Sequence, residues 1–113
     1  YTYKMCSSCK SATNWLKRNG HDFNEFAIRD TPPSISELKS MLAYYNNNIR
    51  LLFNSSGLDY RALNLKEKIS KYTEKDLLLL LSENGNLVKR PFLLGNHYGL
   101  VGFKEAMWEK VIK

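Results

Sequence analysis

The sequence predicts an α/β domain that spans residues 1–113, with a strand–helix–strand unit, a helical insert over about 31–85, and a closing strand–strand–helix unit. Two short strand-like segments flank a helical stretch at the start, and apolar residues then recur at helical spacing through the middle of the chain. The last part carries two more strand-like segments and a final helix. Because 113 residues leave little room for two separate cores, a single domain is expected.

The first thirty residues indicate a β-α-β unit. Tyr1–Tyr3 has the character of the end of a strand, and Phe23–Ile28 is expected to be a second strand with Phe26 and Ile28 on one side. Asn19-Gly20 is expected to end the helix between them, because glycine tolerates the left-handed closing conformation. Two strands joined by a helical crossover are normally parallel. The inward face of this helix is expected to carry Cys9, Ala12, Trp15 and Leu16.

The middle of the chain is expected to be helical. Pro32-Pro33 breaks the preceding strand, and Ser34 with Glu37 matches the capping box that starts a helix. Thr73 has the position of a second helix cap, and Asn84-Gly85 ends the leucine-rich helix that follows it. Shorter helical pieces are expected through Leu51–Phe53 and Tyr60–Leu63.

The end of the chain predicts a hairpin and a helix. Pro91–Leu94 and Tyr98–Val101 are strand-like, and Gly95-Asn96-His97 between them is expected to form the turn. One side of the final helix is expected to carry Phe103, Met107, Trp108 and Val111. The large residues expected in the core are Trp15, Phe26, Met107 and Trp108.

The charge of the chain gives weak information about partners. The net charge is +6, but lysines and arginines are scattered among acids, so a solvated basic surface is favoured over a nucleic-acid interface. The longest apolar run, Leu77–Leu81, is far shorter than the roughly 20 residues of a membrane helix. With no secretory signal visible either, the expectation is a cytoplasmic monomer without nucleic-acid or membrane partners.

Both cysteines lie in the stretch Cys6-Ser7-Ser8-Cys9, at the junction between the first strand and its helix. A cysteine at this junction meets the positive end of the helix and its unpaired N–H groups, which favour the thiolate form. Cys9 lies one turn along, within reach to form a disulfide with Cys6, and Lys10 adds positive charge nearby. The pattern therefore favours a redox-active thiol pair.

Two other interpretations of the cysteines stay open. Structural zinc needs four ligands, whereas this chain has one cysteine pair, and His21 and His97 lack the spacing of a zinc motif. No metal site is therefore expected. The other alternative is that Cys6 and Cys9 are inert buried residues, and the strand–helix context argues against it.

The chain resembles the arsenate reductase-like family, which also contains the Spx regulators and the YffB-type thiol reductases. The likeness covers nearly the whole chain, and its pieces occur in the family's order. They are Tyr1-Thr2, Cys6-Ser7-Ser8-Cys9-Lys10, Thr31-Pro32-Pro33, Leu52–Gly57, Tyr60-Arg61, Lys89-Arg90-Pro91 and Val101-Gly102-Phe103.

The resemblance implies a thioredoxin-like fold with a mixed sheet and a helical insert, and a cis peptide bond before Pro91 beside the reactive cysteine. It assigns the nucleophile to Cys6. In the arsenate reductases three arginines hold the oxyanion; one aligns with Arg90, and the other two fall at Phe53 and Gly102. Because charge-assisted hydrogen bonds hold tetrahedral anions, this departure argues against arsenate turnover unless Lys10, Arg61 or backbone N–H groups substitute.

These observations lead to the hypothesis of a thiol–disulfide oxidoreductase, with Cys6 as nucleophile and Cys9 as resolving thiol. The candidate substrate- or anion-binding residues are Arg90, Lys10 and Pro91. No bound cofactor is expected, and glutathione, glutaredoxin or thioredoxin is the expected electron donor. Two alternatives remain: a glutathione- and glutaredoxin-dependent arsenate reductase, and an Spx-like redox-sensing regulator that binds the alpha subunit of RNA polymerase.

Overall fold

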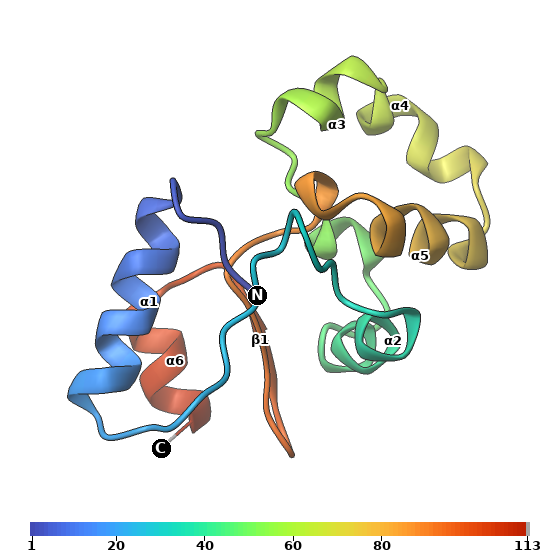
Figure 1. Ribbon diagram of the computed structural model, residues 1–113. Helices are drawn as coiled ribbons and strands as arrows, with labels where there is room; N and C mark the ends of the chain where they lie inside the picture. Colours follow the sequence, from blue (N-terminus) through green and yellow to red (C-terminus); the bar gives the residue numbers. More distant parts are fainter. Residues whose placement is uncertain (113) are drawn as a thin grey trace.

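The structure, a computed structural model, describes residues 1–112 and consists of a short β-hairpin surrounded by helices (Figure 1). The α-helices are α1 (Ser7–Arg18), α2 (Ile35–Tyr44), α3 (Leu58–Ala62), α4 (Leu65–Lys68), α5 (Glu74–Glu83) and α6 (Glu105–Ile112). The strands are β1 (Phe92–Leu94) and β2 (Gly99–Val101). Short 3₁₀ turns cover Ile49–Leu52, Ile69–Lys71 and Gly85–Leu87. The predicted order of elements is confirmed, with the helical insert between the two units that contain the sheet.

Backbone hydrogen bonds extend the hairpin into a mixed sheet. β1 and β2 are antiparallel. On the other side of β1, the terminal amino group of Tyr1 donates to the Phe92 carbonyl at 2.8 Å, and the N–H of Phe92 donates to the Tyr1 carbonyl at 3.0 Å. On the far side of Tyr1, Thr2 forms a parallel bridge with Ala27. The spatial order is therefore the 26–28 segment, the 1–2 segment, β1 and β2, which is the order of a thioredoxin-like fold.

The predicted parallel pairing is confirmed, but the predicted strand Phe23–Ile28 is reduced to one bridge. Two backbone hydrogen bonds hold this segment: the N–H of Thr2 donates to the Phe26 carbonyl at 2.9 Å, and the N–H of Ile28 donates to the Thr2 carbonyl at 2.8 Å. The chain turns immediately afterwards, since the N–H of Asp30 bonds back to the Ala27 carbonyl. Only a short part of the segment is therefore held in the sheet.

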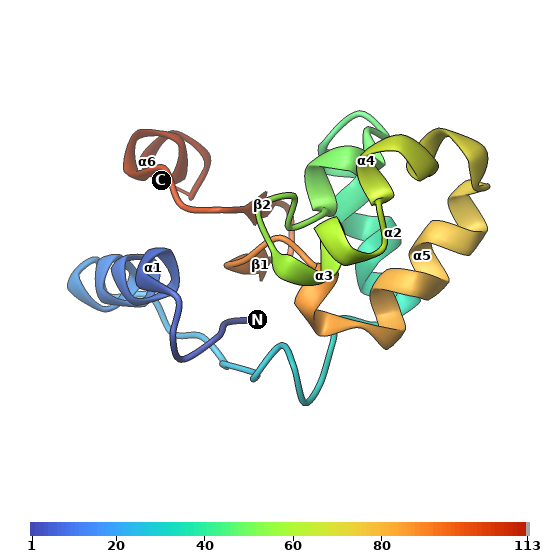
Figure 2. The same ribbon diagram turned by 90° about the horizontal axis from the view of Figure 1, so that it is seen from above.

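The hairpin separates two apolar cores, because successive strand residues point to opposite faces. Phe92 and Val101 pair across the hairpin and pack with the helical insert, whereas Leu93 and Leu100 pair and pack with α1 and α6. Figures 1 and 2 show α1 and α6 lying together on one side of the hairpin and α2 to α5 on the other. That all of residues 1–113 fold as one domain stays a prediction.

α1 is amphipathic as predicted. Cys9, Ala12, Trp15 and Leu16 form its buried face. The helix ends at Asn19, and Gly20 follows with a φ of 73°, the conformation that favours glycine. Trp15 meets Trp108 of α6 edge-to-face at 6.0 Å between ring centroids, which joins the two helices on this side of the sheet.

The helical insert begins at the predicted capping box. Ser34 accepts the N–H of Glu37 at 3.1 Å, and Glu37 accepts the N–H of Ser34 at 3.0 Å. Thr73 caps α5 by accepting the N–H of Asp76, also as predicted. At the end of α5, the backbone of Gly85 packs so closely on the carbonyl of Ile28 that a Cβ there would overlap it. This close approach fixes the insert against the segment after the second strand.

Three residues that the sequence analysis placed on apolar faces are exposed. Phe26 is 46% exposed because its ring lies on that of Tyr1 at the edge of the core, while Ile28 is fully buried. Met107 and Val111 are 49% and 39% exposed, since α6 is buried mainly through Trp108. The predictions of Trp15 and Trp108 as core residues are confirmed. Within the part of the chain that the structure describes, no helix is long and apolar enough to cross a membrane.

Truncating Trp108 should strongly destabilise the fold. Its ring is 1% exposed and its Nε1 donates to the Gly102 carbonyl at 3.1 Å, so Trp108→Ala leaves a large cavity and an unpaired carbonyl. The expected loss in free energy of unfolding is about 3–5 kcal/mol. The neighbouring exposed Met107 provides the control: Met107→Ala should cost roughly 0.5 kcal/mol or less in the same denaturant titration. Equal losses in the two variants would contradict the assigned core.

Candidate functional site

Cys6 is the residue that caps the start of α1. Its backbone is extended, with φ −97° and ψ 111°, and its sulfur accepts the N–H of Cys9 at 3.2 Å. The N–H of Cys6 donates to the Tyr3 carbonyl at 3.0 Å, which anchors the cap to the end of the first strand. The Cys6 sulfur therefore lies among the N–H groups at the start of the helix, the end that attracts negative charge.

The two cysteines differ in accessibility. Both are free thiols; Cys6 is partly exposed, whereas Cys9 is 3% exposed on the inward face of α1. A substrate sulfur can therefore approach Cys6 from solvent, while Cys9 is reached from Cys6 itself. The structure brings the two predicted catalytic residues together one helical turn apart, although their roles stay predictions.

The thiol of Cys9 is held in its protonated form. Burial is the main factor that raises the pKa of Cys9, to about 12, and a hydrogen bond to Cys6 raises it further. The backbone N–H of Tyr3 and the charge of Arg90 act in the opposite direction and lower this pKa. At neutral pH Cys9 is therefore a poor nucleophile as long as Cys6 is not part of a disulfide.

Arg90 lies beside the cysteine pair. The peptide bond from Arg90 to Pro91 is cis, as the resemblance implied, and Pro91 is buried. The Arg90 guanidinium lies over the ring of Tyr3 at 5.1 Å, and one of its nitrogens, Nη1, is buried without a hydrogen-bond partner in the described residues. Arg90 therefore places a positive charge, with one donor uncommitted, next to the reactive helix start.

The other candidate cation, Lys10, is arranged differently. It is exposed in the first turn of α1, and its side chain makes no hydrogen bond or ion pair within residues 1–112. Its backbone N–H donates to the Cys6 carbonyl at 3.2 Å. The case for an anion-binding role at Lys10 thus rests on its position in the chain.

The two positions at which the resemblance placed the missing arginines carry no charge themselves, although Cε of Lys89 lies 3.2 Å from where a Cβ of Gly102 would stand. Phe53 is 2% exposed in the core, and Gly102 has a φ of 71°, which disfavours any side chain there. Arg50 is exposed, and its guanidinium donates weakly to the Lys66 carbonyl at 3.5 Å; Arg61 is exposed on α3. Arg90 remains the one arginine of this set that the structure places beside the cysteines.

Sequence analysis missed two residues of this region, Tyr3 and Arg29. The guanidinium of Arg29 lies over the Tyr3 ring at 4.1 Å, on the same ring that contacts Arg90. The sequence could have indicated them, because Tyr3 is the last residue of one predicted parallel strand and Arg29 directly follows the other. Side chains that follow parallel strands meet at one edge of the sheet.

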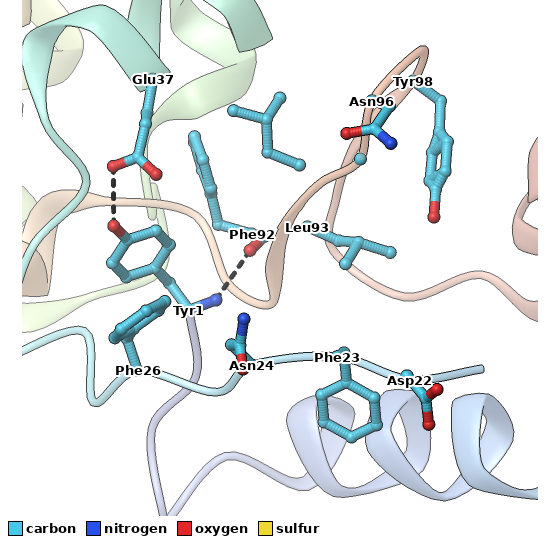
Figure 3. Close-up of a pocket in the computed structure, with 12 residues that line it drawn as sticks. Tyr1, Asp22, Phe23, Asn24, Phe26, Glu37, Phe92, Leu93, Asn96 and Tyr98 are labelled. Atoms are coloured by element: carbon cyan, nitrogen blue, oxygen red, sulfur yellow. Dashed lines mark hydrogen bonds between the residues drawn. The ribbon is translucent and has the colours of Figure 1, made fainter.

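Two further features lie apart from the cysteines. A cavity of about 430 Å³ lies between the segment after α1 and the hairpin turn, and neither cysteine nor Arg90 lines it (Figure 3). The Tyr1 hydroxyl there donates to Glu37 at 2.7 Å, which ties the first strand to α2. Among the described residues, no three His, Cys, Asp or Glu side chains converge as a metal site.

Curated relatives match this chain over nearly its full length. YusI of Bacillus subtilis is 40% identical over 97% of this chain and 93% of its own. The regulatory protein MgsR of the same organism is 30% identical over all of this chain and 88% of its own. The global transcriptional regulator Spx of Enterococcus faecalis is 30% identical over 93% of this chain and 78% of its own.

Solved structures show the same architecture. An ArsC family related protein from Bacteroides fragilis superposes with a TM-score of 0.89 at 38% identity, over 96% of this chain and 92% of its own. A protein from Streptococcus mutans described as a possible arsenate reductase superposes with a TM-score of 0.90 at 31% identity, over 100% of this chain and 95% of its own. The arsenate reductase from Vibrio cholerae, at 23% identity and a TM-score of 0.77 over 99% and 92%, supports the fold alone. The ArsC family model matches residues 1–111, and with these relatives it establishes that the chain belongs to the ArsC family.

Proposed function

We propose that the protein is a thiol–disulfide oxidoreductase in which Cys6 attacks the substrate and Cys9 resolves the adduct. One observation carries the proposal: the accessible Cys6 sulfur accepts the N–H of Cys9 at the start of α1, while Cys9 is buried with its pKa raised by burial to about 12. Membership in the ArsC family supports it. The cytoplasm is the proposed compartment, because its thiol pools keep such pairs reduced.

In the first step, the Cys6 thiolate attacks one sulfur of a substrate disulfide. A bond forms between the Cys6 sulfur and that sulfur, the substrate's own S–S bond breaks, and the other half leaves as a thiolate that takes a proton from water. The N–H of Cys9 and the positive end of α1 stabilise the attacking thiolate. Cys9 stays protonated and does not compete for the substrate.

In the second step, Cys9 attacks the Cys6 sulfur of the adduct. The hydrogen bond and the negative charge of Cys6 both raise the pKa of Cys9, and both disappear once Cys6 is in a disulfide. Tyr3 and Arg90, which lower this pKa, remain in place. Cys9 lies one helical turn from the Cys6 sulfur and attacks it through the small fraction of Cys9 that is thiolate. Its proton goes to solvent, its sulfur bonds to the Cys6 sulfur, and the second half of the substrate leaves as a thiolate that takes a proton from water. Two electrons have passed from the cysteines to the substrate.

The Cys6–Cys9 disulfide must then be reduced by an external donor. Two thiols of glutathione, or the thiol pair of a glutaredoxin or thioredoxin, supply the two electrons and become a disulfide themselves. We propose these donors because the family resemblance implies thiol-based regeneration and because no bound redox cofactor is needed for the cycle.

Two alternative functions remain as candidates. Arsenate reduction is supported by the likeness to the Streptococcus mutans protein described as a possible arsenate reductase. It is weakened by Phe53 and Gly102, which stand where the resemblance places two oxyanion arginines. A redox-switched regulator is supported by the likeness to the regulators MgsR and Spx, both 30% identical to this chain. In that case the disulfide would switch binding to the alpha subunit of RNA polymerase.

Turnover assays separate these functions. NADPH-coupled reduction with glutathione and glutaredoxin should proceed on a mixed disulfide of glutathione and fall about a thousandfold or more in Cys6→Ser, because the attacking sulfur is lost. Ser7→Ala, an exposed neighbour in the same turn, is the matched control and should retain turnover within about twofold. Undiminished turnover in Cys6→Ser would falsify the proposal.

The same assay on arsenate tests the first alternative. Turnover of arsenate that Cys6→Ser abolishes would identify an arsenate reductase, and it would contradict the inference from the missing arginines. Absence of turnover on both substrates, together with redox-dependent capture of the alpha subunit, would identify the regulator.

Alkylation at controlled pH tests the assigned states of the two thiols. At about pH 8 iodoacetamide should modify Cys6 and leave Cys9 essentially untouched, because a thiol with a pKa of about 12 is about 10⁻⁴ thiolate there. Cys6→Ser removes the two contributions of Cys6 but keeps burial, the main factor, so the Cys9 rate in this variant, followed by mass spectrometry, should still rise with pH up to about pH 9. The denatured protein is the control, and a Cys9 rate that levels off below about pH 9 would contradict the assignment.

A further inference from the structure

The ring of Tyr3 has no part in the two-cysteine chemistry described above, although the main chain of Tyr3 contacts both cysteines. Its carbonyl accepts the N–H of Cys6 at 3.0 Å. Burial raises the pKa of Cys9, and the backbone N–H of Tyr3 acts against this effect. The parallel bridge between Thr2 and Ala27 holds the strand that ends at Tyr3. The base of the Tyr3 side chain is therefore fixed relative to both cysteines.

Two guanidiniums lie over the Tyr3 ring. The central carbon of Arg29 is 4.1 Å from the ring centroid, and that of Arg90 is 5.1 Å from it. The face of an aromatic ring attracts cations at such distances, because the quadrupole of the ring is negative there. Arg29 follows the second segment of the parallel bridge and Arg90 precedes β1, so the ring joins two distant parts of the chain.

Within residues 1–112 the Arg90 guanidinium has no hydrogen bond or ion pair that would hold it in place. An arginine side chain has many rotamers, so keeping the guanidinium in one position requires a contact that offsets the lost conformational entropy. The contact that the structure shows for the Arg90 guanidinium is the face of the Tyr3 ring. The ring therefore determines where the Arg90 charge lies.

A neutral ring positions this charge without cancelling it. A carboxylate partner would also fix a guanidinium, as Glu105 pairs with Arg18 at 3.5 Å, but its negative charge would offset much of the positive field at a neighbouring thiol. In the part of the chain that the structure describes, Arg90 has no such partner. The full positive charge of Arg90 is therefore available to act on Cys9.

The position of this charge matters most in the resolving step. Burial is the main factor that raises the pKa of Cys9, and the charge of Arg90 is one of the two contributions that lower it. Once Cys6 is in a mixed disulfide, the two raising contributions of Cys6 are gone, while burial, the Tyr3 N–H and Arg90 remain. A change of one unit in the pKa changes the thiolate fraction tenfold. Displacing the Arg90 guanidinium should therefore slow the attack by Cys9.

We propose that Tyr3 is a positioning residue for the resolving step, because its neutral ring holds the Arg90 guanidinium beside Cys9 and leaves the charge uncompensated. This role rests on the proposed function, since it concerns the second of its two steps. Arg29, the closer cation on the same ring, holds the ring against the neighbouring strand segment. Tyr3 acts through Arg90, and its ring takes no part in the bonds that form and break.

Rapid mixing of the reduced protein with one equivalent of dipyridyl disulfide follows the two steps separately. In the first phase the Cys6 thiolate bonds to one sulfur of the reagent, and the other half leaves as a thiolate that takes up a proton. In the second phase Cys9 gives its proton to solvent and bonds to the Cys6 sulfur, and the second half leaves in the same way. The reagent is uncharged, so Arg90 does not attract it.

The rate of the second phase reports on Tyr3. Tyr3→Leu keeps an apolar side chain against the core and removes the ring, and it should slow the second phase about threefold to tenfold. Tyr3→Phe keeps the ring and should react within about twofold of the native rates. Tyr98→Leu makes the same substitution at a half-buried tyrosine of the cavity without cysteines (Figure 3), and it should leave both phases unchanged.

A double-mutant cycle separates positioning from a general loss of structure. Arg90→Gln should slow the second phase about tenfold, because the charge itself is removed. Adding Tyr3→Leu to Arg90→Gln should then change the rate less than about twofold, since the ring has no charge left to hold. Equal slowing by Tyr3→Leu with and without Arg90, or no slowing at all, would overturn the proposal.

A spectroscopic measurement checks the contact itself. An aromatic ring current moves the Nε–H resonance of a guanidinium that lies over the ring, so this resonance of Arg90 should be shifted upfield in the ¹⁵N-labelled native protein and in Tyr3→Phe. In Tyr3→Leu it should move toward that of an exposed arginine such as Arg50. An Arg90 resonance that stays in place in Tyr3→Leu would contradict the proposal.

The outcome is separable from that of the proposed function. If the native protein shows no first phase, Cys6 is not the attacking thiol and the oxidoreductase is rejected, whereas the Arg90 resonance still tests the contact with Tyr3. A normal first phase, followed by a second phase that Tyr3→Leu does not slow, would reject the positioning role alone.

Discussion

The hydrogen bond from the Cys9 N–H to the Cys6 sulfur determines what each of the two thiols can do. It needs Cys6 to be the cap of α1, with an extended backbone, and it leaves that sulfur partly exposed at the positive end of the helix. The same helix geometry turns Cys9, three residues on, toward the core. One cap therefore separates an accessible thiol from a protected one, and the proposed order of attack follows from this difference.

The sheet holds this cap in place and brings the charges to it. The Thr2–Ala27 bridge aligns the ends of two parallel segments, which puts Tyr3 and Arg29 at the edge where α1 begins. β1 starts two residues after Arg90, so the hairpin brings a second guanidinium to the same tyrosine ring. The helical insert, packed through Gly85, closes the far side of this charged region. The reactive end of α1 and the two arginines beside it thus depend on one strand edge.

Local patterns in the sequence predicted the order of elements, the caps at Ser34 and Thr73, the buried face of α1 and the position of Cys6 at a helix start. These features depend on neighbouring residues, so periodicity and capping rules suffice. The exposure of Phe26 and Met107 was not predicted, because it depends on how far the sheet and α6 extend over the core. The close packing of Gly85 on Ile28 and Arg29 was missed as well, since it joins distant parts of the chain. The cis bond before Pro91 came from the family resemblance, and no local pattern distinguishes it from a trans bond.

The most direct test of the central claim, that Cys6 reacts first and Cys9 second, is the mass of each single variant after treatment with oxidised glutathione. The account predicts a stable mixed disulfide between Cys6 and glutathione in Cys9→Ser, and no adduct in Cys6→Ser, because Cys9 is buried and protonated. The native protein should instead carry an internal disulfide without glutathione. Rapid formation of an adduct on Cys9 in folded Cys6→Ser would contradict the account.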